Sequence, residues 1–185
     1  MPTPKQGKII AAVRTAEEFE NAVNSRVGII FHLSPDLHNL SELAQSAHKN
    51  GKKIFIHLDL ATGIGKDKSG ILFVKNAGID GVISTRVNII KTARECGVFT
   101  VQRFFIVDSQ SVTTTVESVK ASKADMIEIM PGVLTKAIGK LRQLVNVPII
   151  AGGLIETIDE ITDSAKTPML MYSVTPIVTS HKLYH

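Results

Sequence analysis

Short apolar runs alternate with helical patterns along this chain of 185 residues, and that alternation constrains the fold more than any other feature. The runs have the length of buried strands and are bounded by turn residues. We expect strands at Ile9–Val13, Val27–His32, Ile54–Asp59, Gly81–Ser84, Phe99–Val107, Met126–Met130, Pro148–Ala151 and within Met169–Val178. Strands and helices that alternate about eight times predict a parallel sheet.

Helix start signals stand between several of these runs. Thr15-Ala16-Glu17-Glu18 has the capping-box pattern, in which the threonine and the second glutamate satisfy backbone N–H groups reciprocally. Ser41 and Ser109 begin two further helical patterns, and each serine is expected to cap its helix through the hydroxyl group.

Eight strand–helix units favour a small (β/α)8 TIM-type barrel with short loops, since 185 residues allow only about 23 residues per unit. An open parallel α/β sheet with the same connectivity is the alternative, because periodicity does not distinguish the two. The chain contains no linker, repeat array or low-complexity tract, so residues 1–185 are expected to form a single domain.

Composition limits the cellular setting only loosely. The single cysteine, Cys96, excludes a disulfide framework within the chain, and a reducing cytoplasm is the expected location. No apolar run is long enough to cross a bilayer, and the first residues lack the hydrophobic core of a signal peptide. The net charge of +4 would suit an anionic partner, either a phosphorylated metabolite or a nucleic acid.

Polar side chains gather at the ends of three predicted strands, where parallel barrels bind ligands. The period of two puts His57 and Asp59 on the face of Phe55. The same alternation turns Glu128 into the barrel, where a buried carboxylate needs a partner. The neighbouring strand offers Gln102 and Arg103, of which one points inward, and the sequence leaves open which one.

Two glycines, Gly152 and Gly153, follow the seventh strand. Without Cβ atoms the backbone approaches a ligand closely, and N–H groups at a following helix start hold an anion, so these glycines predict phosphate binding, with a plain tight turn as the alternative. Lys66, in the loop Gly65-Lys66-Asp67-Lys68-Ser69-Gly70, offers a flexible cation to the same phosphate.

Several other functions lack a motif. The lysine loop is neither a P-loop nor a GxGxxG fingerprint, so no nucleotide cofactor is expected. No Gly-x-Ser-x-Gly elbow occurs, and the histidines His32, His38, His48 and His57 lack the spacing of metal ligands. We therefore expect no catalytic triad, metal or resident cofactor.

Taken together, six segments resemble the glycerol-uptake operon antiterminator family. They are Ile29–Leu33, His57–Gly70, Gly78–Thr85, Gln102–Phe105, Ile127–Gly132 and Pro148–Ile155, in the family's order. The resemblance implies a bacterial cytoplasmic (β/α)8 barrel that responds to glycerol-3-phosphate. It also implies that the protein binds leader mRNA and prevents premature termination upstream of genes for glycerol use.

The resemblance also implies how the ligand is held. Gly152 and Gly153, with Thr179 and Ser180 as the nearest counterparts of the family's last strand end, would bind the phosphate. His57, Asp59, Arg103 and Glu128 would face the glycerol hydroxyls or one another. The alternative function is a small barrel lyase or isomerase for a phosphorylated metabolite, with Glu128 as base and Arg103 or His57 polarising a carbonyl. The sequence leaves open the oligomeric state, a homo-oligomer among the alternatives, and the RNA-binding surface.

Overall fold

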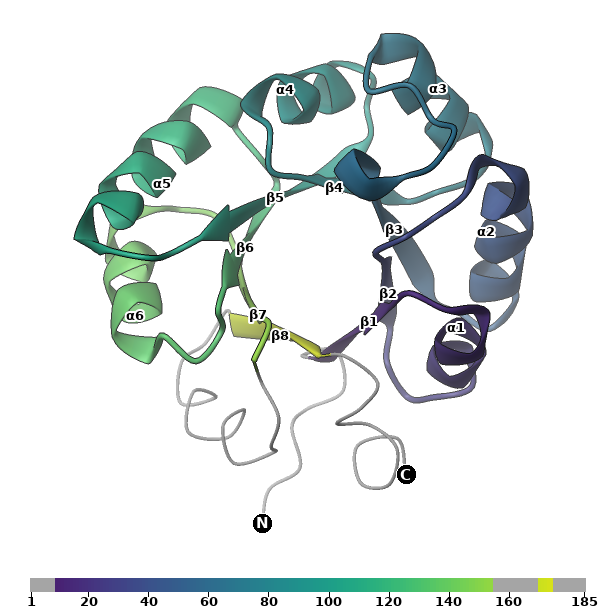
Figure 1. The fold of residues 1–185 in the computed structure, drawn as a ribbon, viewed down its shortest axis with the longest axis horizontal. Coiled ribbons are helices and arrows are strands. Elements are labelled where there is room, and N and C mark those ends of the chain that lie inside the picture. The colour runs from purple at the N-terminus through teal and green to yellow at the C-terminus, as the bar shows by residue number, and fades with distance from the viewer. Residues whose placement is uncertain (1–8, 155–169, 175–185) are drawn as a thin grey trace.

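The computed structural model describes residues 9–154 and 170–174, which form a closed barrel of eight parallel strands in chain order. Figure 1 shows the strands as an inner ring with helices around it. The strands are β1 (Ile9–Val13), β2 (Ile29–His32), β3 (Lys53–His57), β4 (Gly81–Ser84), β5 (Phe99–Phe105), β6 (Met126–Met130), β7 (Ile149–Gly152) and β8 (Leu170–Val174). The barrel prediction is confirmed, and the open sheet is excluded because β8 pairs with both β7 and β1.

Each of the first six strands is followed by an α-helix. The helices are α1 (Ala16–Val23), α2 (Leu40–Lys49), α3 (Lys68–Asn76), α4 (Val87–Glu95), α5 (Ser109–Ser122) and α6 (Thr135–Leu144). Two short 3-10 turns, η1 (Leu37–Asn39) and η2 (Leu58–Leu60), follow β2 and β3. The strand–helix alternation of the sequence is therefore the observed order of elements.

The predicted helix caps are correct in one case and wrong in two. Thr15 caps α1 and forms the complete capping box with Glu18. Ser41 lies inside α2, whose N-cap is Asn39, because η1 leads directly into that helix. Ser109 is the first residue of α5 rather than its cap, since the carboxylate of Asp108 accepts the hydrogen bond from the Ser111 N–H group.

Alternation along the strands separates two layers of side chains. Side chains that point inward fill the barrel, and the buried apolar ones are Ile10, Ala12, Phe31, Leu33, Phe55, Ile83, Val101 and Ile150. The other face of each strand packs against the helices, as Ile54 and Ile127 do. Among the described residues, the buried polar side chains of the interior, such as His57, Arg103 and Glu128, lie toward the carboxyl ends of the strands, and this places the candidate site.

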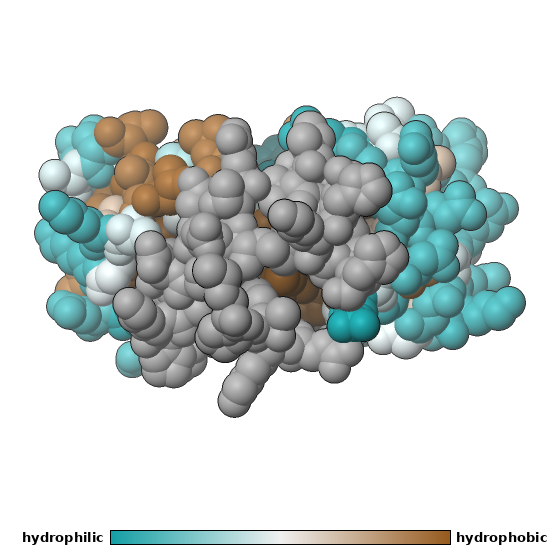
Figure 2. Space-filling model, turned by 90° about the horizontal axis from the view of Figure 1, so that it is seen from below, coloured by the Kyte–Doolittle hydropathy of each residue, from teal (hydrophilic) through white to brown (hydrophobic). Residues whose placement is uncertain are grey.

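The surface around the barrel is uneven in character. Several exposed apolar side chains lie at or after the ends of β5, β6 and β7, namely Phe105, Val107, Val133 and Leu154, and others, such as Leu60 and Phe73, lie elsewhere. Figure 2, a side view, shows hydrophobic residues gathered on the side where α5 and α6 lie in Figure 1. Within residues 9–154 and 170–174, none of the helices has the length and hydrophobicity needed to cross a lipid bilayer.

Candidate functional site

An ion pair lies inside the barrel near the carboxyl ends of β5 and β6. Arg103 and Glu128 are register partners on these adjacent strands, and Arg103 Nε donates to Glu128 Oε2 over 2.7 Å. Both side chains are almost completely buried, with 7% and 1% of their surfaces exposed. Gln102 points outward, and its amide donates to Ser118 Oγ on α5. The structure thus answers the open question, since Arg103 is the inward residue and the partner of Glu128.

Gly152 on β7 makes room for this carboxylate. An ideal Cβ at Gly152 would lie 2.5 Å from Glu128 Oε1, closer than real Cβ atoms approach, and 3.2 Å from Glu128 Cδ, which is a tight contact. The space that the absent side chain leaves is therefore occupied by Glu128. Oε1 has no hydrogen-bond partner in the structure as described, so half of a buried carboxylate remains open to a donor.

His57 ends β3 and lies on the face of Phe55, as predicted, and this face points into the barrel. The side chain is buried, and Nδ1 has no partner among the residues described. Burial, with help from the Arg103 charge, lowers the pKa of His57 from 6.5 to about 4, against the opposing effect of Asp59. The imidazole is therefore neutral at neutral pH and offers one donor and one acceptor.

Asp59 lies elsewhere than predicted. The strand ends at His57, and Asp59 belongs to the 3-10 turn η2, so the period of two does not extend to it. Its carboxylate accepts hydrogen bonds from Ser84 Oγ, from the N–H and Oγ1 of Thr85, and from Arg86 Nε. Although burial opposes the change, these hydrogen bonds lower the pKa of Asp59. Asp59 thus fastens the loop after β4 to the loop after β3.

Lys66 is half-buried beside this anchored loop. Its Nζ donates to the carbonyl oxygen of Ala61 over 2.6 Å. Burial lowers the pKa of Lys66. Asp59 raises this pKa and Arg86 lowers it, and both effects are smaller than that of burial. The Lys66 charge makes a small contribution to the lowered pKa of His57.

The loop after β7 is held by the loop after β6. The N–H group of Gly132 donates to the carbonyl oxygens of Gly152 and Gly153, at 2.6 and 3.0 Å. Gly153 has φ +70°, a conformation that glycine adopts most readily, and a Cβ there would lie 2.7 Å from Met130 Cε. Thr179 and Ser180, the other predicted phosphate ligands, lie outside the described residues.

Sequence reasoning missed two features of this region. Ser173, on the interior face of β8, is buried and pairs in register with Gly152. Extending the alternation from Met171 would have identified it, had the bounds of the last strand been known. The sequence also gave no sign that Arg86 would meet Asp59, since 27 residues separate them.

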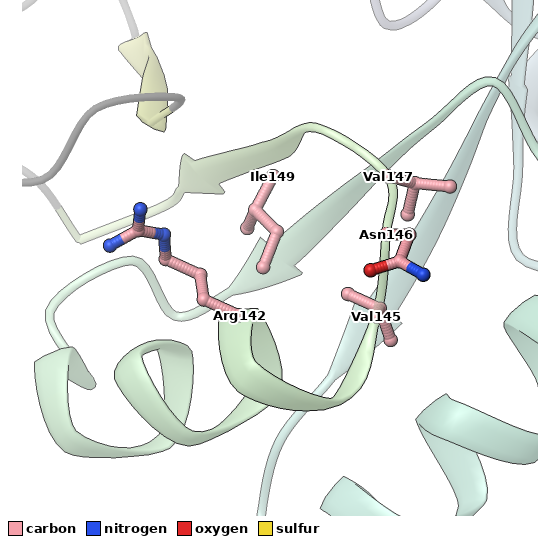
Figure 3. Close-up of a pocket in the computed structure, with 5 residues that line it drawn as sticks. All are labelled: Arg142, Val145, Asn146, Val147 and Ile149. Carbon is pink, nitrogen blue, oxygen red and sulfur yellow. The ribbon is translucent and has the colours of Figure 1, made fainter.

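The structure brings together His57, Arg103, Glu128 and Gly152, with Ser173 beside them. Asp59 and Lys66 lie farther out, around the mouth. No group of three potential metal ligands occurs in the described part of the chain. A separate cavity of about 240 Å³, lined by Arg142, Val145, Asn146, Val147 and Ile149, lies around the turn that joins α6 to β7 (Figure 3). That turn leads to the amino end of β7, opposite the polar mouth.

Comparisons with known proteins identify the chain's relatives. A family model described as the glycerol-3-phosphate responsive antiterminator matches residues 9–182. The chain belongs to this family. This family member is 36% identical over 152 residues to the protein YgcP of Escherichia coli K12, covering 82% of this chain and 80% of YgcP.

Two solved structures are similar to this antiterminator-family chain over almost their whole length. One is the glycerol uptake operon antiterminator regulatory protein of Listeria monocytogenes, with 29% identity, a TM-score of 0.85 and coverage of 98% and 97%. The other is a glycerol uptake operon antiterminator-related protein of Thermotoga maritima, with 29% identity, a TM-score of 0.81 and coverage of 96% and 98%. Solved aldolases at 9% to 14% identity share the fold alone.

Proposed function

We propose that this chain is a single-barrel transcription antiterminator that binds glycerol-3-phosphate and, in response, the leader mRNA of glycerol-utilisation genes. The observation that carries the proposal is the family match, which spans the barrel from β1 to beyond β8. The antiterminator regulatory protein of Listeria monocytogenes and the antiterminator-related protein of Thermotoga maritima have the same fold at 29% identity. The proposal therefore rests on two observations: the match to a regulatory family, and the polar side chains at the mouth of the barrel.

In this proposal the glycerol part of the ligand enters the mouth above the ion pair. Glu128 Oε1 accepts a hydrogen bond from a hydroxyl group of the ligand. Neutral His57 donates a hydrogen bond to the glycerol part of the ligand or accepts one from it. Arg103 holds Glu128 in place beneath the ligand, because its Nε donates to Glu128 Oε2 and its charge is balanced by that carboxylate.

The phosphate in this proposal lies at the rim, between Lys66 and the loop that begins at Gly152 and Gly153. Thr179 and Ser180 remain proposed ligands from the sequence. Gly153 is partly exposed and lets the backbone approach the phosphate closely, and Lys66 supplies a positive charge. Asp59 supports the site because its hydrogen bonds hold the loop that contains Arg86 against the loop that contains Lys66.

Calorimetric titration with glycerol-3-phosphate tests this site. We expect binding at millimolar ligand or below, and weaker binding of at least about tenfold for Lys66→Met, since a charge-assisted contact is lost. Lys68→Met is the matched control, because Lys68 is exposed at the start of α3. No heat with glycerol-3-phosphate, glycerol or other triose phosphates would contradict the proposal.

A filter-retention assay with leader RNA tests the regulatory half of the proposal. We expect glycerol-3-phosphate to strengthen retention, and added salt to weaken it, because protein cations displace counterions from the RNA backbone. We also propose that the chain is a regulator and not an enzyme. Turnover of any compound in a triose-phosphate panel, without RNA retention, would favour a lyase or isomerase instead.

A further inference from the structure

Among the described residues, the buried charges inside the barrel mouth balance each other before any ligand enters. Arg103 and Glu128 neutralise each other over 2.7 Å, and both are buried. No other acidic or basic side chain among the described residues is both buried and on the interior faces of the strands, apart from His57. A charged ligand tail would therefore find no unused counter-charge at this depth among the residues that the structure describes.

The hydrogen-bonding groups beside the ion pair favour a ligand whose end opposite the phosphate is neutral and carries a hydroxyl group. Glu128 Oε1 accepts only, and it lacks a donor. Ser173 and Glu128 lie on either side of Gly152, one through the β7–β8 register and the other through its close approach to that glycine. The Ser173 hydroxyl donates or accepts, so a ligand hydroxyl between these strands has a partner on each side.

A carboxylate in the ligand tail would meet the opposite conditions. It would place a second acceptor-only, negatively charged group near Glu128, whose oxygens already need donors. Bringing a carboxylate out of water without a cation carries a large penalty, and Arg103 is already paired. This desolvation penalty applies to a ligand that ends in a carboxylate and not to one that ends in a hydroxyl group.

We infer that Glu128 determines ligand specificity, because it admits phosphorylated polyols and excludes phosphorylated acids of the same length. The inference rests on the proposed function, since it concerns the tail of the same ligand. It adds a selection between a terminal hydroxymethyl group and a terminal carboxylate.

The test compares glycerol-3-phosphate with 3-phosphoglycerate by calorimetry on the whole chain. The two ligands share the three-carbon skeleton and the phosphate, and differ in the terminal group. We expect wild-type protein to bind glycerol-3-phosphate more tightly by a factor on the order of 100. In Glu128→Gln the amide keeps the size of the side chain and releases the Arg103 charge, so the affinity ratio should fall at least about tenfold.

Two control variants separate charge from shape. Glu128→Asp keeps the negative charge and is expected to keep rejecting the acid. Glu117→Gln removes a charge from the exposed face of α5 and should leave the ratio unchanged. Thermal unfolding of each variant establishes that it is folded under the conditions of the titration.

The outcomes are distinguishable. Comparable affinity of wild-type protein for both ligands would overturn this inference and leave the proposed function standing, whether or not Glu128→Gln folds. Selectivity that Glu128→Gln retains as fully as Glu117→Gln would also overturn it. Binding of neither ligand would overturn the proposed function, and this inference with it.

Discussion

Replacement of Gly152 by alanine tests whether the interior of the mouth is packed as described. The new Cβ would lie 2.5 Å from Oε1, 3.2 Å from Cδ and 3.3 Å from Cγ of Glu128. A carboxylate at the end of a free side chain would move away at little cost. Here the other carboxylate oxygen is held by Arg103, and the side chain is completely buried.

The size of the effect follows from these contacts. If the neighbouring strands shift to accept the methyl group, overpacking costs about 1–3 kcal/mol. If Glu128 instead turns away from Arg103, the loss approaches the roughly 3–5 kcal/mol of a broken buried ion pair. Even the smaller range lowers the melting temperature by roughly 2–12 °C for a chain of this length.

Urea unfolding followed by circular dichroism measures this change. Gly139→Ala is the matched control, because no atom lies within 4 Å of its ideal Cβ and the residue is in α6. We expect that control to stabilise the protein by about 0.5–1 kcal/mol, as alanine does in a helix. If Gly152→Ala proved as stable as Gly139→Ala, the packing of Glu128 against β7 would be refuted.

Three further predictions concern single side chains. Arg103→Met leaves the Glu128 charge buried and alone, so urea unfolding should show a loss of about 3–5 kcal/mol; an unchanged midpoint would contradict the ion pair. The pKa of His57 is lowered from 6.5 to about 4 in the folded protein. Between pH 6.5 and pH 4 the unfolded chain therefore binds more protons at His57 than the folded chain does, so the free energy of unfolding falls as the pH falls from 6.5 to 4. The fall should reach roughly 2–4 kcal/mol relative to His57→Gln at pH 4, in urea titrations at each pH. Thr15→Ala removes a capping box and should cost about 1 kcal/mol in thermal melts, whereas Ser41→Ala, which removes no cap, should stay within about 0.5 kcal/mol.

The sequence predicts the barrel well because its signals are local. Hydrophobic runs and capping residues depend on neighbours within a few positions, and the ranges Ile9–Val13, Gly81–Ser84 and Met126–Met130 agree with the structure at both ends. Alternation along a strand also predicts that Glu128 points inward, because the side-chain period of a strand is two.

The candidate site is harder to predict because its contacts join different strands. Which of Gln102 and Arg103 faces inward depends on the register between β5 and β6. The prediction that Asp59 shares the face of Phe55 is wrong, because a 3-10 turn interrupts the alternation of the strand after His57. The role of Gly152 in making room for Glu128 follows only from three-dimensional packing, which no local pattern encodes.

A crystal structure determined with glycerol-3-phosphate tests the central claim most directly. The account predicts ligand density at the carboxyl ends of the strands, with a glycerol hydroxyl within hydrogen-bond distance of Glu128 Oε1 and the phosphate toward Lys66 and Gly153. Density for the ligand anywhere else, such as the cavity between α6 and β7, with an empty barrel mouth, would contradict it.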